Sequence, residues 1–139
     1  NIYLIGSIMG LNKKDVQGVF EDIVNFSNLK EFLDTKVYQF SSGMVTRLTF
    51  SIFIHCINCR RPEILLLDEV IVAGGDIDFT KKASEKMKEL VLSGSTVLFV
   101  SHGLGEIENY CSKTVWIEKG KIKMLGDTKS VIQKYKESA

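Results

Sequence analysis

The stretch Ile64-Leu65-Leu66-Leu67-Asp68-Glu69 decides the fold of this chain, because four aliphatic residues are followed there by two carboxylates. A short apolar run of this kind is typical of a strand buried in a sheet. Its last residues bring two negative charges to the edge of that sheet. Carboxylates in such a place can hold a divalent cation and a water, since Mg²⁺ in proteins keeps several of its waters. The sequence therefore predicts a metal-assisted site at Asp68 and Glu69.

A turn of small residues lies earlier in the chain, before a helical stretch that runs from Val45 to Asn58. The turn consists of Ser41, Ser42, Gly43 and Met44. The backbone N–H groups and the dipole at the start of a helix attract anions. Ser-Ser-Gly before a helix is also common for capping alone, and the two roles are compatible. Together with the two carboxylates, this turn indicates phosphate chemistry.

The pattern of apolar residues divides the chain into two parts. From Asn1 to about Arg61 the spacing is helical, with an apolar stripe between Val16 and Val24 and a plausible N-cap at Asn12. Leu29 to Leu33 suggests a second, short helix. From Glu63 onward, buried strands alternate with helices, and this alternation predicts a parallel sheet covered on both faces. The predicted later elements are strands 64–67, 96–100, 114–117 and 121–125, the last two joined by a tight turn at Lys119-Gly120, and helices 79–91, 104–111 and 128–135. The first of these helices carries an apolar stripe of Phe79, Ala83, Met87, Leu90 and Val91.

Composition limits the class of protein. The 139 residues suffice for one domain with a real core, and 45% hydrophobic and 25% charged residues are ordinary for a globular protein. A formal net charge of +1 argues against a strong electrostatic surface for nucleic acid. No apolar run approaches the ~20 residues that span a bilayer. We therefore expect no nucleic-acid partner and no direct membrane span.

Three cysteines invite a metal or redox interpretation. Cys56 and Cys59 form a C-x-x-C pair beside His55, whereas Cys111 stands alone. A zinc site needs a second pair of ligands, which the sequence does not offer. Two small apolar residues three apart on one helix face explain the pair better, and the odd count fits a reducing cytoplasm.

The order of three motifs resembles that of the ABC-transporter ATPases. Residues 40–47, Phe-Ser-Ser-Gly-Met-Val-Thr-Arg, look like the signature LSGGQxxR, and the strand ending at Asp68 looks like Walker B. Residues 97–102, Val-Leu-Phe-Val-Ser-His, look like the strand and switch histidine. The wording of residues 1–6 (NIYLIG) and of SSGM, DEV and FVSHGL resembles the subfamily that energises export of bacterial polysaccharides and teichoic acids. The resemblance covers nearly the whole chain.

The resemblance implies a role for each motif at an ATP site. Asp68 is then a ligand of Mg²⁺, Glu69 polarises the water that attacks the γ-phosphate, and His102 senses that phosphate by hydrogen bonding. Read without the resemblance, Asp68 and Glu69 are solvated acids at a strand end, and His102 is a surface histidine. We favour the functional interpretation because the three motifs occur in one order.

The signature turn implies a dimer, because in ABC proteins it closes over ATP held by the opposing subunit. Relative to LSGGQ, the chain has Phe40 for Leu, Ser42 for Gly and Met44 for Gln, and the last change removes a polar side chain. Asp76 looks like the aspartate of the D-loop, after residues 70–75 that replace the usual P-T-S-A-L. Asp78 is a competing candidate, or an N-cap of the next helix.

The phosphate-cradling motif G-x-x-x-x-G-K-[ST] is not found in the chain. In the family, this loop precedes everything seen here, so we interpret the chain as the C-terminal part of a nucleotide-binding domain. We expect an α/β fold, a partial P-loop NTPase core preceded by the ABC helical subdomain. Residues 1–61 would be the helical subdomain and residues 62–139 the later half of the core. Without the P-loop half, one side of the core is expected to be uncovered, and the chain alone inactive and prone to associate.

The function implied by the resemblance is that of an ATP-binding and ATP-hydrolysing subunit of an ABC exporter for polysaccharide or lipid-linked glycan. ATP and Mg²⁺ are the expected cofactors. The expected partners are a second ATP-binding subunit, in a homodimer, and a membrane permease at the cytoplasmic face of the inner (plasma) membrane. Two alternatives are a non-catalytic regulatory ABC subunit, which the altered signature supports, and a soluble ATPase of the DNA-repair kind, which usually carries long coiled coils.

Overall fold

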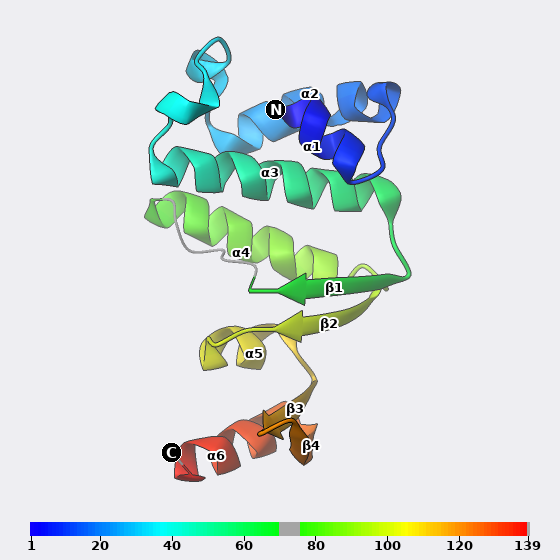
Figure 1. Cartoon of the computed structure of the whole chain (residues 1–139), viewed down its shortest axis with the longest axis vertical. Helices are drawn as coiled ribbons and strands as arrows, with labels where there is room; N and C mark the ends of the chain where they lie inside the picture. The colour runs from blue at the N-terminus through cyan, green and yellow to red at the C-terminus, as the bar shows by residue number, and fades with distance from the viewer. Residues whose placement is uncertain (70–75, 139) are drawn as a thin grey trace. The chain divides into compact units, whose positions relative to one another are not determined.

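A computed structural model describes residues 1–69 and 76–138 of the chain (Figure 1). These residues form two compact units. The first contains residues 1–64 and 76–96, and the second contains residues 65–69 and 97–138. The sequence predicts a different kind of boundary, between a helical subdomain of residues 1–61 and a core half of residues 62–139. That division stays a prediction.

The first unit consists of helices. Its helices are α1 (Ile2–Ile8), α2 (Lys13–Ser27), α3 (Ser42–Arg60) and α4 (Ile77–Val91). The short 3₁₀ turns η1 (Lys30–Phe32) and η2 (Val37–Gln39) lie between α2 and α3. The expected second helix near Leu29 is only the single turn η1. The helix predicted over residues 79–91 is confirmed by α4.

The N-terminus of α2 shows why this segment is helical. The side chain of Asn12 accepts hydrogen bonds from the backbone N–H groups of Lys14 and Asp15, and the Asp15 carboxylate accepts from the Asn12 N–H at 3.1 Å. This reciprocal capping box satisfies donors that the first helical turn leaves unpaired. The N-cap predicted at Asn12 is confirmed.

The core of the first unit forms where α1, α2 and α3 pack together. Its fully buried members come from the predicted stripe of α2 and from the apolar surface of α3: Val16, Ile23, Val24, Ile52 and Cys56, together with Ile2 and Leu11. Gly6 allows α1 to approach α2, since a Cβ there would lie 2.6 Å from Val16 Cγ2. This backbone approach explains a glycine inside a helix, a position where glycine normally costs stability.

Aromatic rings extend this core to α4. The ring of Phe26 on α2 lies 5.6 Å from that of Phe79 on α4, and the ring of Phe50 on α3 lies 6.1 Å from Phe79. Edge-to-face contacts of this kind add to the energy of area burial. Of the predicted stripe of α4, Phe79, Ala83, Met87 and Leu90 are buried, whereas Val91 is partly exposed.

The second unit holds most of a parallel pair of strands, β1 (Ile64–Asp68) and β2 (Thr96–Val100), whose arrows run in one direction in Figure 1. Leu65 and Leu67 are buried, whereas Ile64 and Leu66 are 67% and 70% exposed. The prediction of a strand buried on both faces is therefore wrong for half of the side chains of β1. Within residues 1–69 and 76–138, no other residue covers the side chains of Ile64 and Leu66. This agrees with the expectation that one side of the core is uncovered.

The strand β2 is also less buried than predicted. Leu98 and Val100 are 61% and 53% exposed, and none of its residues is fully buried. An uninterrupted apolar run predicts burial on both faces, but it does not say which part of a protein provides the cover.

The remaining elements of the second unit are the helix α5 (Leu104–Tyr110), the strands β3 (Lys113–Glu118) and β4 (Lys121–Asp127), and the helix α6 (Thr128–Ser138). The strands pair antiparallel as a separate two-stranded sheet. Lys119 and Gly120, with φ of 49° and 74°, form the predicted tight turn, because left-handed residues match the twist of a hairpin. The Trp116 ring contacts that of Tyr135 at 5.2 Å and holds α6 on this hairpin.

Candidate functional site

The end of β1 carries the first pair of predicted site residues. Asp68 is the last residue of the strand, and Glu69 follows it with a left-handed φ of 46°. Few residues other than glycine adopt this conformation, and in many proteins such strain occurs at functional sites. The Glu69 N–H donates a hydrogen bond to the Val100 carbonyl at 2.9 Å, which ties the end of β1 to the end of β2. Both carboxylates are exposed.

His102 stands two residues after the end of β2, within reach of Glu69. Its Nε2 lies 2.6 Å from Glu69 Oε1, and the two side chains are 93% and 51% exposed. Parallel strands place their carboxyl ends at the same edge of a sheet, so two motifs 33 positions apart in sequence meet there. The structure thus brings together Glu69 and His102, which the sequence singled out separately.

This pair has a definite electrostatic character. If the imidazole is protonated, it forms an ion pair with the carboxylate; if it is neutral, its Nε2–H can donate a hydrogen bond to Oε1. In either state the contact uses Oε1, and the other carboxylate oxygen remains to accept a proton or orient a water. An exposed carboxylate beside an imidazole can therefore take part in proton transfer.

Asp68 and Glu69 fit a magnesium ion in their donor chemistry. Mg²⁺ takes oxygen ligands, keeps several waters and usually binds through one or two carboxylates together with substrate phosphates. Within residues 1–69 and 76–138, no three His, Cys, Asp or Glu side chains come together to form a ready-made metal cage. The carboxylates at the end of β1 therefore suit a magnesium ion that is also held by waters and phosphates, and not a metal ion held by protein ligands alone.

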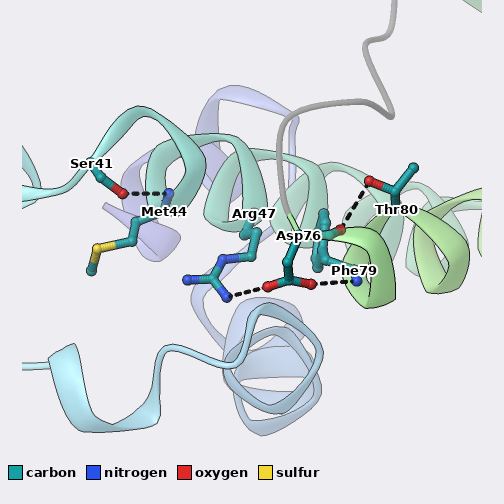
Figure 2. Close-up of polar contacts among 6 residues, drawn as sticks. All are labelled: Ser41, Met44, Arg47, Asp76, Phe79 and Thr80. Carbon is teal, nitrogen blue, oxygen red and sulfur yellow. Dashed lines mark hydrogen bonds and ion pairs between the residues drawn. The ribbon is translucent and has the colours of Figure 1, made fainter.

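The signature turn belongs to the first unit, where it begins α3. Ser41 is the N-cap of that helix, and its Oγ accepts a hydrogen bond from the Met44 N–H at 3.3 Å (Figure 2). Ser42 and Gly43 are the first residues of the helix. The capping interpretation of the turn is confirmed. The early N–H groups of α3 still point outward from the start of a 19-residue helix, where an anion is favoured.

Asp76 lies at the start of α4, also in the first unit. Its Oδ1 accepts a hydrogen bond from the Phe79 N–H at 2.8 Å, so Asp76 is the N-cap of α4 (Figure 2). The alternative that Asp78 caps this helix is wrong, because Asp78 lies inside its first turn. Residues 70–75, the expected replacement for P-T-S-A-L, lie outside the described residues.

Arg47 is a contact of the site that the sequence did not predict. Its guanidinium lies 3.4 Å from Asp76 Oδ2. The arginine is the last residue of the signature-like segment, and that position was the only signal that could have marked it. Its partner, 29 residues later in the chain, could not be read from the sequence.

The structural interpretation of the C-x-x-C pair is confirmed for Cys56, which belongs to the core of the first unit, but not for Cys59. Cys56 is buried and Cys59 exposed, and all three cysteines are free thiols. His55 Nδ1 lies 2.7 Å from the Ser51 carbonyl, and its ring meets that of Phe26 at 5.4 Å, so the histidine is satisfied within the helices. Burial raises the pKa of the Cys56 thiol, and the neighbouring Cys59 raises it further.

Comparison with known proteins agrees with this arrangement. No protein-family model matches the chain. The chain is 40% identical over 138 residues to the O-antigen export system ATP-binding protein RfbB of Klebsiella pneumoniae. This match covers 99% of the chain and 54% of RfbB. It is 38% identical over 137 residues to the teichoic acids export ATP-binding protein TagH of Bacillus anthracis, covering 99% of the chain and 24% of the relative. The chain thus spans about half the length of RfbB and a smaller share of TagH.

Solved structures show the same fold. The structure of an ATP-binding subunit of an ABC transporter matches with a TM-score of 0.69 at 21% identity, covering 97% of this chain and 56% of that one. A nucleotide-free ATP-binding cassette from an ABC transporter matches with a TM-score of 0.61.

These findings identify the class by similarity: over 99% of its length, the chain is similar to ATP-binding proteins of export systems, and it has the fold of ABC-transporter ATP-binding subunits. Within that class, it is similar to the subfamily whose members are O-antigen and teichoic-acid export ATP-binding proteins. The resemblance seen in the motifs is therefore confirmed. Of the helices in residues 1–69 and 76–138, none combines the length and apolar character needed to span a bilayer.

Proposed function

We propose that this chain supplies the hydrolytic residues of an ABC ATPase that drives export of a polysaccharide or lipid-linked glycan. The observation that carries the proposal is the 2.6 Å separation of Glu69 Oε1 and His102 Nε2, beyond the ends of two parallel strands. Its relatives, named as export ATP-binding proteins, support the transport part of the proposal.

In the proposed reaction, Glu69 positions the attacking water and accepts its proton. His102 donates from Nε2–H to the Glu69 carboxylate and, as the imidazolium, donates from Nδ1–H toward a phosphate oxygen. An imidazole suits this work because it can donate near neutral pH. Positioning and electrostatics supply most of the catalysis in phosphoryl transfer, so these two residues need only hold their geometry.

Asp68 would hold Mg²⁺, most simply through a bound water. When bound, the ion would neutralise charge on the phosphates. The exposed position of Asp68 at the strand end leaves room for the water shell that magnesium keeps.

The turn of Ser41, Ser42 and Gly43 would act in a second copy of the protein. There it would close over the phosphates of ATP held by the first copy, with hydroxyl and backbone N–H groups as donors. Met44, where the family pattern has a glutamine, would contribute no side-chain hydrogen bond. Asp76, at the start of α4, would transmit a signal between the two ATP sites.

The partner of the resulting dimer would be a membrane permease. ATP would close the dimer and hydrolysis would open it, and the region from Asn1 to Leu11 would pass this motion to the permease at the cytoplasmic face of the membrane. The printed chain by itself, without a P-loop motif, should not hydrolyse ATP.

Glu69→Gln in the complete protein tests this assignment. We expect turnover of ATP to fall by roughly 100-fold or more while ATP binding persists, because the amide keeps the size of the side chain but accepts no proton. Glu63→Gln, an exposed carboxylate just before the same strand, is the matched control and should leave turnover unchanged. Unchanged turnover in Glu69→Gln would exclude Glu69 as the catalytic base.

A further inference from the structure

Two hydrogen bonds that share the Ser101 hydroxyl stabilise the turn that carries His102, and the proposed reaction does not use them. The Ser101 hydroxyl donates to Glu106 Oε2 at 2.5 Å, and it accepts a hydrogen bond from the Gly103 N–H at 2.9 Å. His102 is thus bracketed by two residues that are joined through one hydroxyl, and that hydroxyl is held by a carboxylate from the first turn of α5.

Gly103 allows the carboxylate to reach this position. Its φ of −84° is open to any residue, so backbone conformation does not require a glycine here. A Cβ at this position, however, would lie 3.0 Å from Glu106 Oε2 and 3.2 Å from Glu106 Cδ. The Gly103 carbonyl also accepts the Glu106 N–H at 3.0 Å. The backbone and the side chain of Glu106 therefore both pack on the residue that follows His102.

The His102 side chain has little other support. It is 93% exposed, so packing does not fix its direction, and its orientation must come from the backbone of its own turn. Glu69, in contrast, is anchored by its N–H to the Val100 carbonyl. Of the two partners in the 2.6 Å contact, the histidine depends more on the local turn.

We propose that Glu106 is a positioning residue for His102, and that it acts through the Ser101 hydroxyl. It holds the turn of residues 101–103 in the conformation that places the imidazole beside Glu69. The proposal rests on the proposed function, since it assigns Glu106 a part in ATP hydrolysis. Glu106 needs only to accept a hydrogen bond, because the contact with Ser101 uses its oxygen and not its charge.

A purely structural role for Glu106 is the competing explanation. An acidic residue in the first turn of a helix interacts favourably with the helix dipole. That role requires the negative charge and would not depend on His102. Two features therefore separate the explanations: whether the uncharged amide of glutamine can replace the carboxylate, and whether the effect of losing Glu106 disappears when His102 is already absent.

The experiment is a double-mutant cycle in the complete protein, with single-turnover and steady-state ATP hydrolysis as readouts. We expect Glu106→Ala to lower kcat roughly tenfold with little change in KM, since a small misplacement of a catalytic group is costly. Glu106→Gln should restore kcat. In a His102→Ala background, Glu106→Ala should have no further effect, because residues that act through one another are not additive.

Further variants guard against trivial results. Ser101→Ala removes the same link without touching α5 and should reproduce Glu106→Ala, whereas Ser101→Thr keeps the hydroxyl and should behave like the wild type. Glu108→Gln, on the same helix, breaks only the exposed contact with Lys136 at 3.6 Å and should not alter kcat.

The outcomes distinguish the two proposals. If the wild-type protein does not hydrolyse ATP, or if His102→Ala retains full turnover, the proposed function itself fails, and the positioning role fails with it. If His102→Ala is impaired but Glu106→Ala has no effect or costs the same factor in both backgrounds, only the positioning role is overturned. The same holds if Glu106→Gln is as slow as Glu106→Ala.

Discussion

Arg47 and Asp76 form an ion pair that joins the signature helix to the start of α4, with 3.4 Å between Nη1 and Oδ2 (Figure 2). The Arg47 side chain is only 19% exposed, so its charge is partly withdrawn from water. The other oxygen of Asp76 caps α4 through the Phe79 N–H. One carboxylate therefore serves two helices of the first unit.

Removing this carboxylate should destabilise the protein more than removing its charge. We expect Asp76→Ala to lower the free energy of unfolding by about 1–2 kcal/mol, because the cap and a partner of a half-buried arginine are both lost. Asp76→Asn can still cap and should cost less than about 1 kcal/mol. Denaturant unfolding of the variants measures both values.

Asp78→Ala is the control for these variants, since Asp78 lies in the first turn of α4 and is not its N-cap. It should change stability less than Asp76→Ala. If the order of the two alanine variants were reversed, Asp78 and not Asp76 would cap α4.

The three thiols should differ in reactivity. The thiolate is the reactive species, and burial raises the pKa of Cys56 and of Cys111, so both carry less thiolate near neutral pH than a free cysteine. Cys59 is exposed. We expect a maleimide to modify Cys59 first, as judged by mass spectrometry of the labelled peptides. A Cys59→Ser variant should label slowly, and fast labelling of Cys56 would show that its face of α3 is open.

The 139-residue chain expressed alone should self-associate through the exposed apolar side chains of β1 and β2. Leu66 and Leu98 are 70% and 61% exposed, and apolar side chains of this size on strands favour contact between molecules. We expect sedimentation velocity to show concentration-dependent association, and Leu66→Gln with Leu98→Gln to reduce it. Leu67→Gln, at a residue 2% exposed, should unfold the chain instead. A monomeric wild-type chain with one sharp unfolding transition would contradict this prediction.

Local chemistry explains which elements the sequence predicted well. The cap at Asn12, the buried stripe of α4 and the turn at Lys119–Gly120 depend on residues close together in the chain, so short patterns suffice to find them. The strands β1 and β2 were located correctly for the same reason. Their burial was overestimated because it depends on what lies against them.

The site shows the same limit. The sequence identified Glu69 and His102 by motif, but their contact needed the pairing of β1 with β2. The roles of Arg47 and Glu106 were missed, since each acts on a partner whose position is fixed by the folded backbone. Resemblance singles out Asp76, but its function as a helix cap depends on the position where α4 begins.

The central claim is that one copy of the protein supplies Glu69 while the other supplies the turn containing Gly43. Mixed dimers of the complete protein test it with two substitutions, Glu69→Gln and Gly43→Asp, the latter placing a carboxylate where phosphate oxygens would approach. With the substitutions on opposite copies, one composite site remains intact, and we predict about half of the wild-type ATP turnover. With both on one copy opposite a wild-type copy, neither site is complete, and turnover should be lost. The reverse pattern would show that each site is built from a single copy, and it would contradict the account.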